Sequence, residues 1–229
     1  MADKPSRSLV LFGDGLARFI HSHFHSLASL SSCGFLSLPE SEDERTVREV
    51  AVLLDACPQT LPDRFMGMKA AILTLGFSVL KLDELALELL KLLGFQEGKV
   101  LDSDHFDLVF FHNYMDALVG GVMSQMQPGS DISSRLHLSV VVSYGNILEK
   151  NSHLSVLYPL QSYAMKGGDV RHYSPMLIAQ WQSAVTRKDN AERFSFEDFM
   201  EHGGNLTIPA DRFLHEIAFK LWKAPKYGA

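Results

Sequence analysis

Short apolar runs alternate with stretches of helical periodicity along most of the chain, a pattern typical of α/β layering. The apolar runs predict strands at residues 8–12, 69–74, 107–112, 138–143 and 176–180. The run at 107–112 is apolar on both faces, which suits a central strand covered by helices on each side. The predicted fold is therefore α/β, with a mostly parallel central sheet flanked by helices.

Two helices are predicted in the first half of the chain. Apolar residues recur at helical spacing over 16–27 and again over 82–93. Asp83 is suited to the N-cap of the second helix, and Gly94 stands just past its end. These signals separate the first three predicted strands from one another.

Two more helices are predicted near the C-terminal end. Ser195 and Asp198 resemble a capping box, with Asp in the position usually held by Glu. Gly203 is expected to end that helix. Pro209 is expected in the first turn of the last helix, whose apolar face runs over 213–221.

The remaining segments are predicted from charge and turn residues. The charged stretch 40–49 begins a predicted surface helix, whereas 58–63 and 127–134 are predicted as loops. Residues 144–174 show no clear period. A loop of that length is uncommon and is often functional.

Composition narrows the class of protein. The chain has 229 residues, 46% of them hydrophobic, and a formal net charge of -6. We therefore expect one domain over 1–229 and no broad surface for nucleic acid or anionic membranes. Cys33 and Cys57 lack metal-site spacing, and no secretory signal or bilayer-spanning stretch is evident. The expected compartment is the cytoplasm, with the nucleus as an alternative.

The first predicted strand ends in Gly13-Asp14-Gly15. In an open α/β sheet, ligands and metals bind at the carboxyl ends of the strands, so Asp14 is a candidate metal ligand flanked by glycines that leave room for one. The alternative is that Asp14 caps the following helix. The segment is not a dinucleotide fingerprint, because Arg18 stands at the third glycine position.

Three histidines follow in the predicted helix 16–27. His21 and His25 are four residues apart and share a face, whereas His23 is expected on the apolar face. A zinc site needs three or four protein ligands, so a solvated polar face is the favoured interpretation.

Two ionisable residues, His112 and Asp116, follow the predicted central strand. Their position at its carboxyl end makes Asp116 a candidate metal ligand and His112 a candidate ligand-binding residue. Helix capping and core hydrogen bonding are the alternative roles.

Neutral and cationic candidates occur further along. Asn146 lies in a turn-like sequence after the strand 138–143 and could contact a ligand. Lys166, Arg171 and His172 lie in a glycine-containing segment whose cations suit phosphate. The alternative for this segment is an ordinary surface loop.

In order, these segments resemble the alkaline-phosphatase superfamily, and most of all the archaeal-type cofactor-independent phosphoglycerate mutases. The resemblance rests on Gly13-Asp14-Gly15 and on the segments 107–116, 138–146, 171–178, 196–206 and 226–229. It implies that Asp14, Asp116 and His172 match metal ligands of that family. It also implies the core of that fold, with a phosphorylated small molecule as the class of ligand.

The chain departs from the family where catalysis would occur. Residues 57–69 leave room only for a loop where the family carries an inserted domain, and no Gly-Ser nucleophile motif is found. Gly120 stands at the position of a metal-binding His, and Gly145 and Asn146 stand at the positions of an Asp-His pair. Three ligands would not hold two metal ions with the usual geometry.

The sequence therefore predicts a degenerate, non-catalytic member of that family, with no catalytic residue and no cofactor. It would act by binding a protein partner, a second copy of itself or a phosphorylated ligand. The alternative is a phosphomonoester hydrolase or phosphomutase that uses one divalent ion (Mn, Zn or Mg) at Asp14, Asp116 and His172.

Overall fold

The structure is a computed structural model. It describes residues 5–14, 20–40, 45–74, 82–101, 105–112, 116–144, 154–159, 169–172, 174–185, 187–203 and 207–225. Gly15, Asn146 and Lys166, which the sequence analysis singled out, lie outside the described residues.

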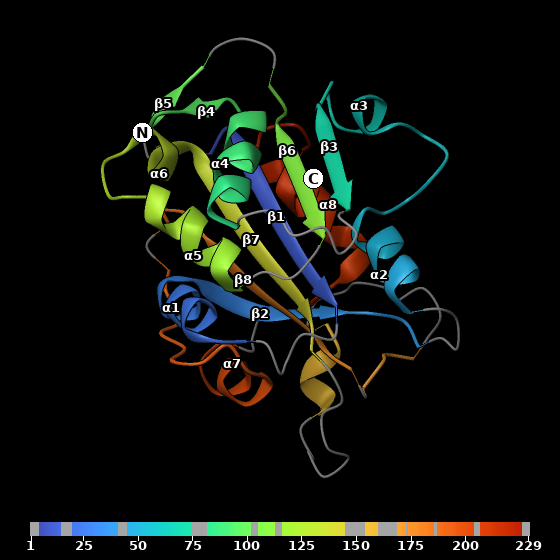
Figure 1. Cartoon of the computed structure of the whole chain (residues 1–229). Coiled ribbons are helices and arrows are strands. Elements are labelled where there is room, and N and C mark those ends of the chain that lie inside the picture. The colour runs from blue at the N-terminus through green and yellow to red at the C-terminus, as the bar shows by residue number, and fades with distance from the viewer. Residues whose placement is uncertain are drawn as a thin grey trace.

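A seven-stranded sheet in the order β3-β6-β1-β7-β8-β2-β9 forms the centre of the molecule (Figure 1). All five predicted strands are confirmed to within two residues at each end. The strands of the main sheet are β1 (Arg7–Asp14), β2 (Ser32–Ser37), β3 (Ala70–Thr74), β6 (Leu108–His112), β7 (Leu136–Ser143), β8 (Met176–Trp181) and β9 (Thr207–Pro209). A separate hairpin pairs β4 (Phe95–Gln96) with β5 (Lys99–Val100).

Four neighbouring strands, β3, β6, β1 and β7, run parallel, and only β8 runs against its neighbours. The prediction of a mostly parallel sheet is confirmed. β2 was not predicted, because its sequence is short and contains Gly34, which weakens the pattern of a strand. It forms because it is buried between β8 and β9, and such packing outweighs intrinsic strand preference.

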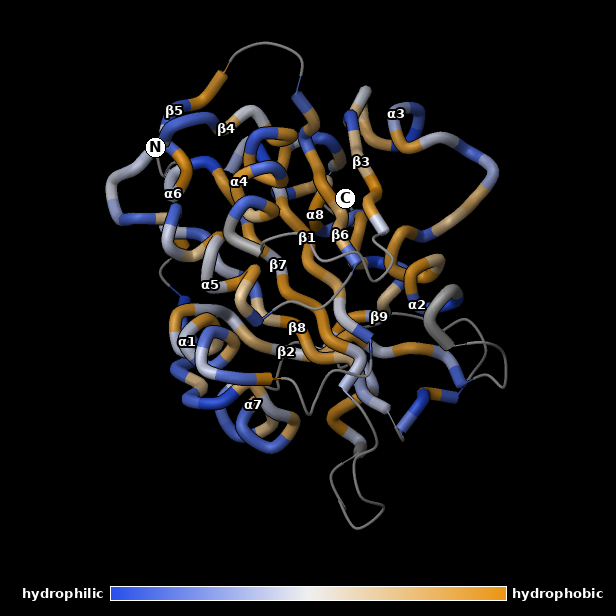
Figure 2. The backbone as a smooth tube through the Cα atoms, viewed as in Figure 1, coloured by the Kyte–Doolittle hydropathy of each residue, from blue (hydrophilic) through white to orange (hydrophobic). Residues whose placement is uncertain are grey.

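Helices cover both faces of the sheet. One face carries α1 (Ser22–Leu30), α4 (Leu82–Leu92), α5 (Asp116–Gln125) and α7 (Phe196–His202). The other carries α2 (Arg45–Leu53), α3 (Leu61–Arg64) and α8 (Phe213–Lys220). Apolar residues concentrate along the central strands between these two layers (Figure 2). No helix in the described part of the chain is long and apolar enough to cross a bilayer.

The predicted helix ends are mostly confirmed. The hydroxyl of Ser195, the N-cap of α7, accepts a hydrogen bond from the Asp198 amide at 3.2 Å, and Gly203 is the C-cap. Gly94 follows α4 with φ of 80°, a conformation that favours glycine. Asp83, however, is the second residue of α4 rather than its N-cap.

Other boundary predictions were wrong. Pro209 is the last residue of β9 with an extended ψ of 136°, and a 3-10 turn, η3 (Ala210–Arg212), separates it from α8. The predicted loop 58–63 contains most of α3, and the predicted loop 127–134 contains most of α6 (Asp131–Arg135). Within 144–174, the described residues include a 3-10 turn, η2 (Leu154–Leu157).

Candidate functional site

Polar residues gather where the parallel strands end. β1, β6 and β7 end at Asp14, His112 and Ser143, and the register pairs Asp14 with Ser143. Side chains alternate between the two faces of a strand. The side chains of Asp14, His112 and Ser143 therefore lie on the same face of the sheet as Phe12, the face that α2 and α8 cover. The structure therefore brings Asp14 and His112 to one edge of the sheet, as the strand ends predicted.

A buried network of three side chains occupies this edge. Glu49, on α2, and Arg171 form an ion pair, and their side chains are only 2% and 7% exposed. The Ser143 hydroxyl donates to Glu49 Oε1 at 3.0 Å. Arg171 also donates from Nε to the Ser174 carbonyl at 2.9 Å and from Nη2 to Ser143 Oγ at 3.5 Å. The network ties α2 and the segment before β8 to the end of β7.

Arg171 was a candidate phosphate ligand, and its guanidinium is instead engaged by a carboxylate inside the protein. A buried ion pair is stable only when its geometry is good and further hydrogen bonds satisfy both groups. Here Ser143 and the Ser174 carbonyl supply such bonds. An anion could reach this guanidinium only in competition with Glu49.

Asp116 is the first residue of α5 and is 7% exposed. Its Oδ1 accepts hydrogen bonds from the backbone amides of His21 at 3.2 Å and Phe24 at 3.3 Å. These amides lie at the N-terminus of α1, where an anion is favoured by the helix dipole. The contacts of this oxygen therefore match helix capping, the alternative role considered for Asp116.

The two other histidine candidates make aromatic contacts. The His112 ring stacks on Phe12 with 5.3 Å between the ring centroids. The His172 ring lies 5.5 Å from that of Tyr158, and its Nδ1 is buried without a hydrogen-bond partner in the described part of the structure.

The three predicted metal ligands do not form a compact group. Among the described residues, only Asp198, Glu201 and His202 on α7 place three such ligand atoms within 4.8 Å of one another. Asp14 lies on the α2 face, whereas Asp116 contacts α1, which packs on the opposite face. A shared ion at Asp14, Asp116 and His172 stays a prediction, and it would require these side chains to move.

The histidines of the predicted helix 16–27 differ in their exposure and contacts. The interpretation of His23 as an apolar-face residue was wrong, because His23 is exposed while Phe24 and Leu27 face the core. A Cβ at Gly120 would lie 2.6 Å from His23 Nδ1, so α1 packs closely on α5 here. His25 Nδ1 accepts from the Phe194 amide at 3.1 Å.

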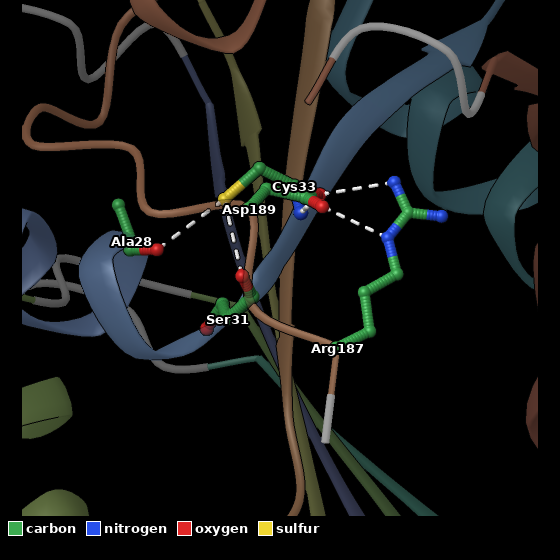
Figure 3. A network of polar contacts seen from close by, with 5 residues as sticks. All are labelled: Ala28, Ser31, Cys33, Arg187 and Asp189. Atoms are coloured by element: carbon green, nitrogen blue, oxygen red, sulfur yellow. Dashed lines mark hydrogen bonds and ion pairs between the residues drawn. The ribbon is translucent and has the colours of Figure 1, made fainter. Parts of the chain in front are cut away.

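Cys33 belongs to a structural network near the start of β2 (Figure 3). Its amide donates to Asp189 Oδ2 at 2.7 Å, and Arg187 Nε holds Asp189 Oδ1 at 2.8 Å. Burial first, and then the charges of Asp189 and Asp198, raise the pKa of the Cys33 thiol. The thiol is therefore a poor nucleophile.

A second buried polar cluster lies toward the other end of β7. His137 Nε2 is 3.2 Å from Ser139 Oγ and 3.5 Å from Nζ of Lys220, on α8. Lys220 donates to Gln180 Oε1 at 3.0 Å, and Gln180 donates to Ser139 at 3.1 Å. Burial lowers the pKa of Lys220 to about 8 and, together with Lys220, lowers that of His137 well below its usual value.

Glu49, Ser139, His137 and Lys220 were not singled out from sequence. Glu49 was assigned to a charged surface helix, yet it is four residues before the buried Leu53 and shares its helical face. That spacing, among three valines, was the available signal that this acid points inward.

Comparison with known proteins supports the fold only. No family model matches the chain, and no curated protein matches it. A solved structure, the PH0037 protein from Pyrococcus horikoshii, is similar with a TM-score of 0.58 and 12% identity, and the similarity covers 99% of each chain. At that identity the likeness concerns the α/β architecture alone.

Proposed function

We propose that this protein is a non-catalytic α/β binding protein, a degenerate relative of phosphoglycerate mutase-like enzymes that binds a protein partner or a phosphorylated ligand. The buried Glu49–Arg171 pair at the carboxyl edge of the sheet is the observation that carries the proposal. It fills, with a neutral internal pair, the place where an α/β enzyme usually presents its reactive groups.

The chemistry of phosphoryl transfer supports the same reading. Such a site needs cations or metal ions aimed at the phosphoryl oxygens, and a nucleophile or positioned water. In the described part of this edge, Arg171 neutralises Glu49, and Asp116 Oδ1 serves the N-terminus of α1. These groups stabilise the fold rather than developing charge on a substrate.

A second candidate function is a hydrolase that uses one metal ion, and His172 is the observation that favours it. Its buried Nδ1 has no hydrogen-bond partner in the described structure, as a ligand nitrogen awaiting an ion would. A buried polar atom without a partner is uncommon and requires an explanation.

One experiment separates the two functions. The purified protein is assayed for bound Mn, Zn and Mg, and for hydrolysis of an aryl phosphate with each ion added. Asp14→Asn is compared with Glu192→Gln, a matched change at an exposed residue. We expect no metal-dependent turnover in any of the three proteins.

Turnover that requires metal, disappears in Asp14→Asn and persists in Glu192→Gln would overturn the non-catalytic proposal. Binding is then tested directly, by affinity capture of a defined complex and by titration with phosphorylated metabolites. A lack of both complex and ligand would remove the binding function as well.

A further inference from the structure

A cavity of about 290 Å³ lies beside α2, at the carboxyl ends of β2 and β9. Ser37 and Pro209, the last residues of these two strands, form its floor with Ala210. One side is formed by α2, where Ala51 and Val52 follow Arg48 by three and four residues, and by Asp55, two residues past the end of the helix. The crevice outside the carboxyl ends of strands is where open α/β sheets bind ligands.

The lining combines both signs of charge with an apolar wall. Arg48 contributes a guanidinium, and Asp55 and Asp211 contribute carboxylates. Between them stand small apolar side chains, those of Ala51, Val52, Ala56, Pro39 and Pro209. A ligand that satisfies this lining carries an anionic group, a cationic donor and a compact apolar body.

The two carboxylates are oriented by arginines outside the cavity lining. Arg64 forms an ion pair with Asp55 and donates to its backbone carbonyl at 2.8 Å. Arg212 Nε lies 3.8 Å from Asp211 Oδ1. A carboxylate offers about four lone-pair positions, so one that already has a partner can also accept from a ligand ammonium.

Asp55 occupies a backbone position where glycine is the usual residue. The Ala56 amide donates to the Ala51 carbonyl at 2.8 Å and the Asp55 amide to Val52 at 2.9 Å, which closes α2 with a Schellman motif. Asp55 itself has φ of 43°, in the left-handed region. Aspartate adopts this region more readily than most residues, so the turn keeps a carboxylate beside the cavity.

We propose that this cavity binds a free α-amino acid with a short aliphatic side chain. Arg48 receives the α-carboxylate, since a guanidinium pairs with carboxylate through two parallel hydrogen bonds. Asp55 and Asp211 receive the ammonium group, and the alanine, valine and proline side chains contact the aliphatic part. The volume lies at the lower limit of about 300–1,000 Å³ for ligand pockets, which suits a small ligand.

Titration calorimetry with three matched probes tests the proposal on the intact protein. Valine carries both charges, isobutylamine lacks the carboxylate, and isovalerate lacks the ammonium. We expect saturable binding of valine, and binding about tenfold or more weaker for each of the other two, because each loses a charge-assisted contact.

Two variants locate the site. Arg48→Gln is expected to weaken valine about tenfold or more, and Asp211→Asn is expected to reduce the preference for valine over isovalerate. Arg135→Gln, at an exposed residue on α6, is the matched control and should leave binding unchanged. If Arg48→Gln does not fold, as judged by circular dichroism, Asp211→Asn carries the same test.

Three results would overturn the proposal. These are no saturable binding of valine at millimolar concentration, equal affinity for valine and isovalerate, or a folded Arg48→Gln protein that binds valine as the wild type does. Because none of these readouts uses Asp14 or a phosphate, they are independent of the function proposed above.

Discussion

The two ends of β7 each carry a buried polar cluster on the same face of the sheet, and they differ in charge balance. At the carboxyl end, Glu49 and Arg171 neutralise each other, and Ser143 bonds to both. Toward the amino end, Lys220 contacts the neutral side chains of His137 and Gln180, and the carboxylate of Glu216, one turn earlier on α8, only partly offsets its burial. Burial is therefore compensated by pairing at one end and by a lowered pKa at the other.

The comparison shows how a fold can keep ionisable groups in its interior without using them for catalysis. A buried ion pair holds separate elements together, as Glu49 and Arg171 do for α2 and the segment before β8. Where burial outweighs the attraction of a nearby carboxylate, as at Lys220, the pKa falls, and the contribution of the cation to stability depends on pH.

The largest expected effect comes from breaking the paired cluster. Arg171→Met leaves the Glu49 carboxylate buried without its cation, which should lower the free energy of unfolding by about 3–5 kcal/mol. Urea denaturation monitored by circular dichroism measures the loss. Lys91→Met, in an ion pair with Glu88 whose side chains are 59% and 66% exposed, should cost less than about 1 kcal/mol.

The double variant Glu49→Leu/Arg171→Met sharpens this result. Removing both charges should recover much of the stability that Arg171→Met loses, because no buried charge remains. Additive losses in the double variant would show that the pair does not act as a unit.

The cluster that contains Lys220 predicts a pH-dependent stability. The pKa of Lys220 is about 8 in the folded protein, against 10.5 for an ordinary lysine. Between these values the unfolded chain binds the proton and the folded chain does not, so stability should rise with pH from about 8 to 10.5. Lys220→Met should remove this rise, measured as urea midpoints across that range.

Lys188→Met, at an exposed lysine, provides the control for this experiment and should keep the rise. A flat profile in the wild type would mean that Lys220 remains protonated in the folded state. In that case the cluster that contains Lys220 would not make stability depend on pH over this range.

A smaller effect is expected from changing Asp116, which caps α1 and belongs to neither polar cluster of β7. Asp116→Ala removes the acceptor for the His21 and Phe24 amides and should cost about 1 kcal/mol, the usual value of a helix cap. Chemical denaturation measures it, and Asp131→Ala, at an exposed position, is the comparison. A change much greater than that of a cap would indicate a further role for this carboxylate.

The smallest effect concerns the contact between α1 and α5. A methyl group at position 120 would meet the His23 ring, but His23 is exposed and its side chain can turn aside. Gly120→Ala should therefore change the free energy of unfolding by less than about 1 kcal/mol, since helix propensity offsets the crowding. In a protein that already carries His23→Ala, Gly120→Ala should be stabilising. If Gly120→Ala still lowers the free energy of unfolding there, the strain lies in the backbone.

Local pattern was enough to predict most of the fold. β6 was recognised because a strand buried on both faces reads as a continuous apolar run. The Ser195 cap and Gly94 were recognised because their roles depend on neighbours within a few residues. β2 was missed, since pairing with distant strands, rather than local preference, decides it.

For the candidate site, the sequence by itself determined that Asp14 and His112 stand at the carboxyl edge, because strand direction and length place them there. Only the tertiary structure decided what the polar groups contact. Glu49 lies 122 residues from Arg171, and Asp116 lies 95 residues from His21. No local periodicity encodes such pairings, which arise when packing removes water and each buried charge must find a partner.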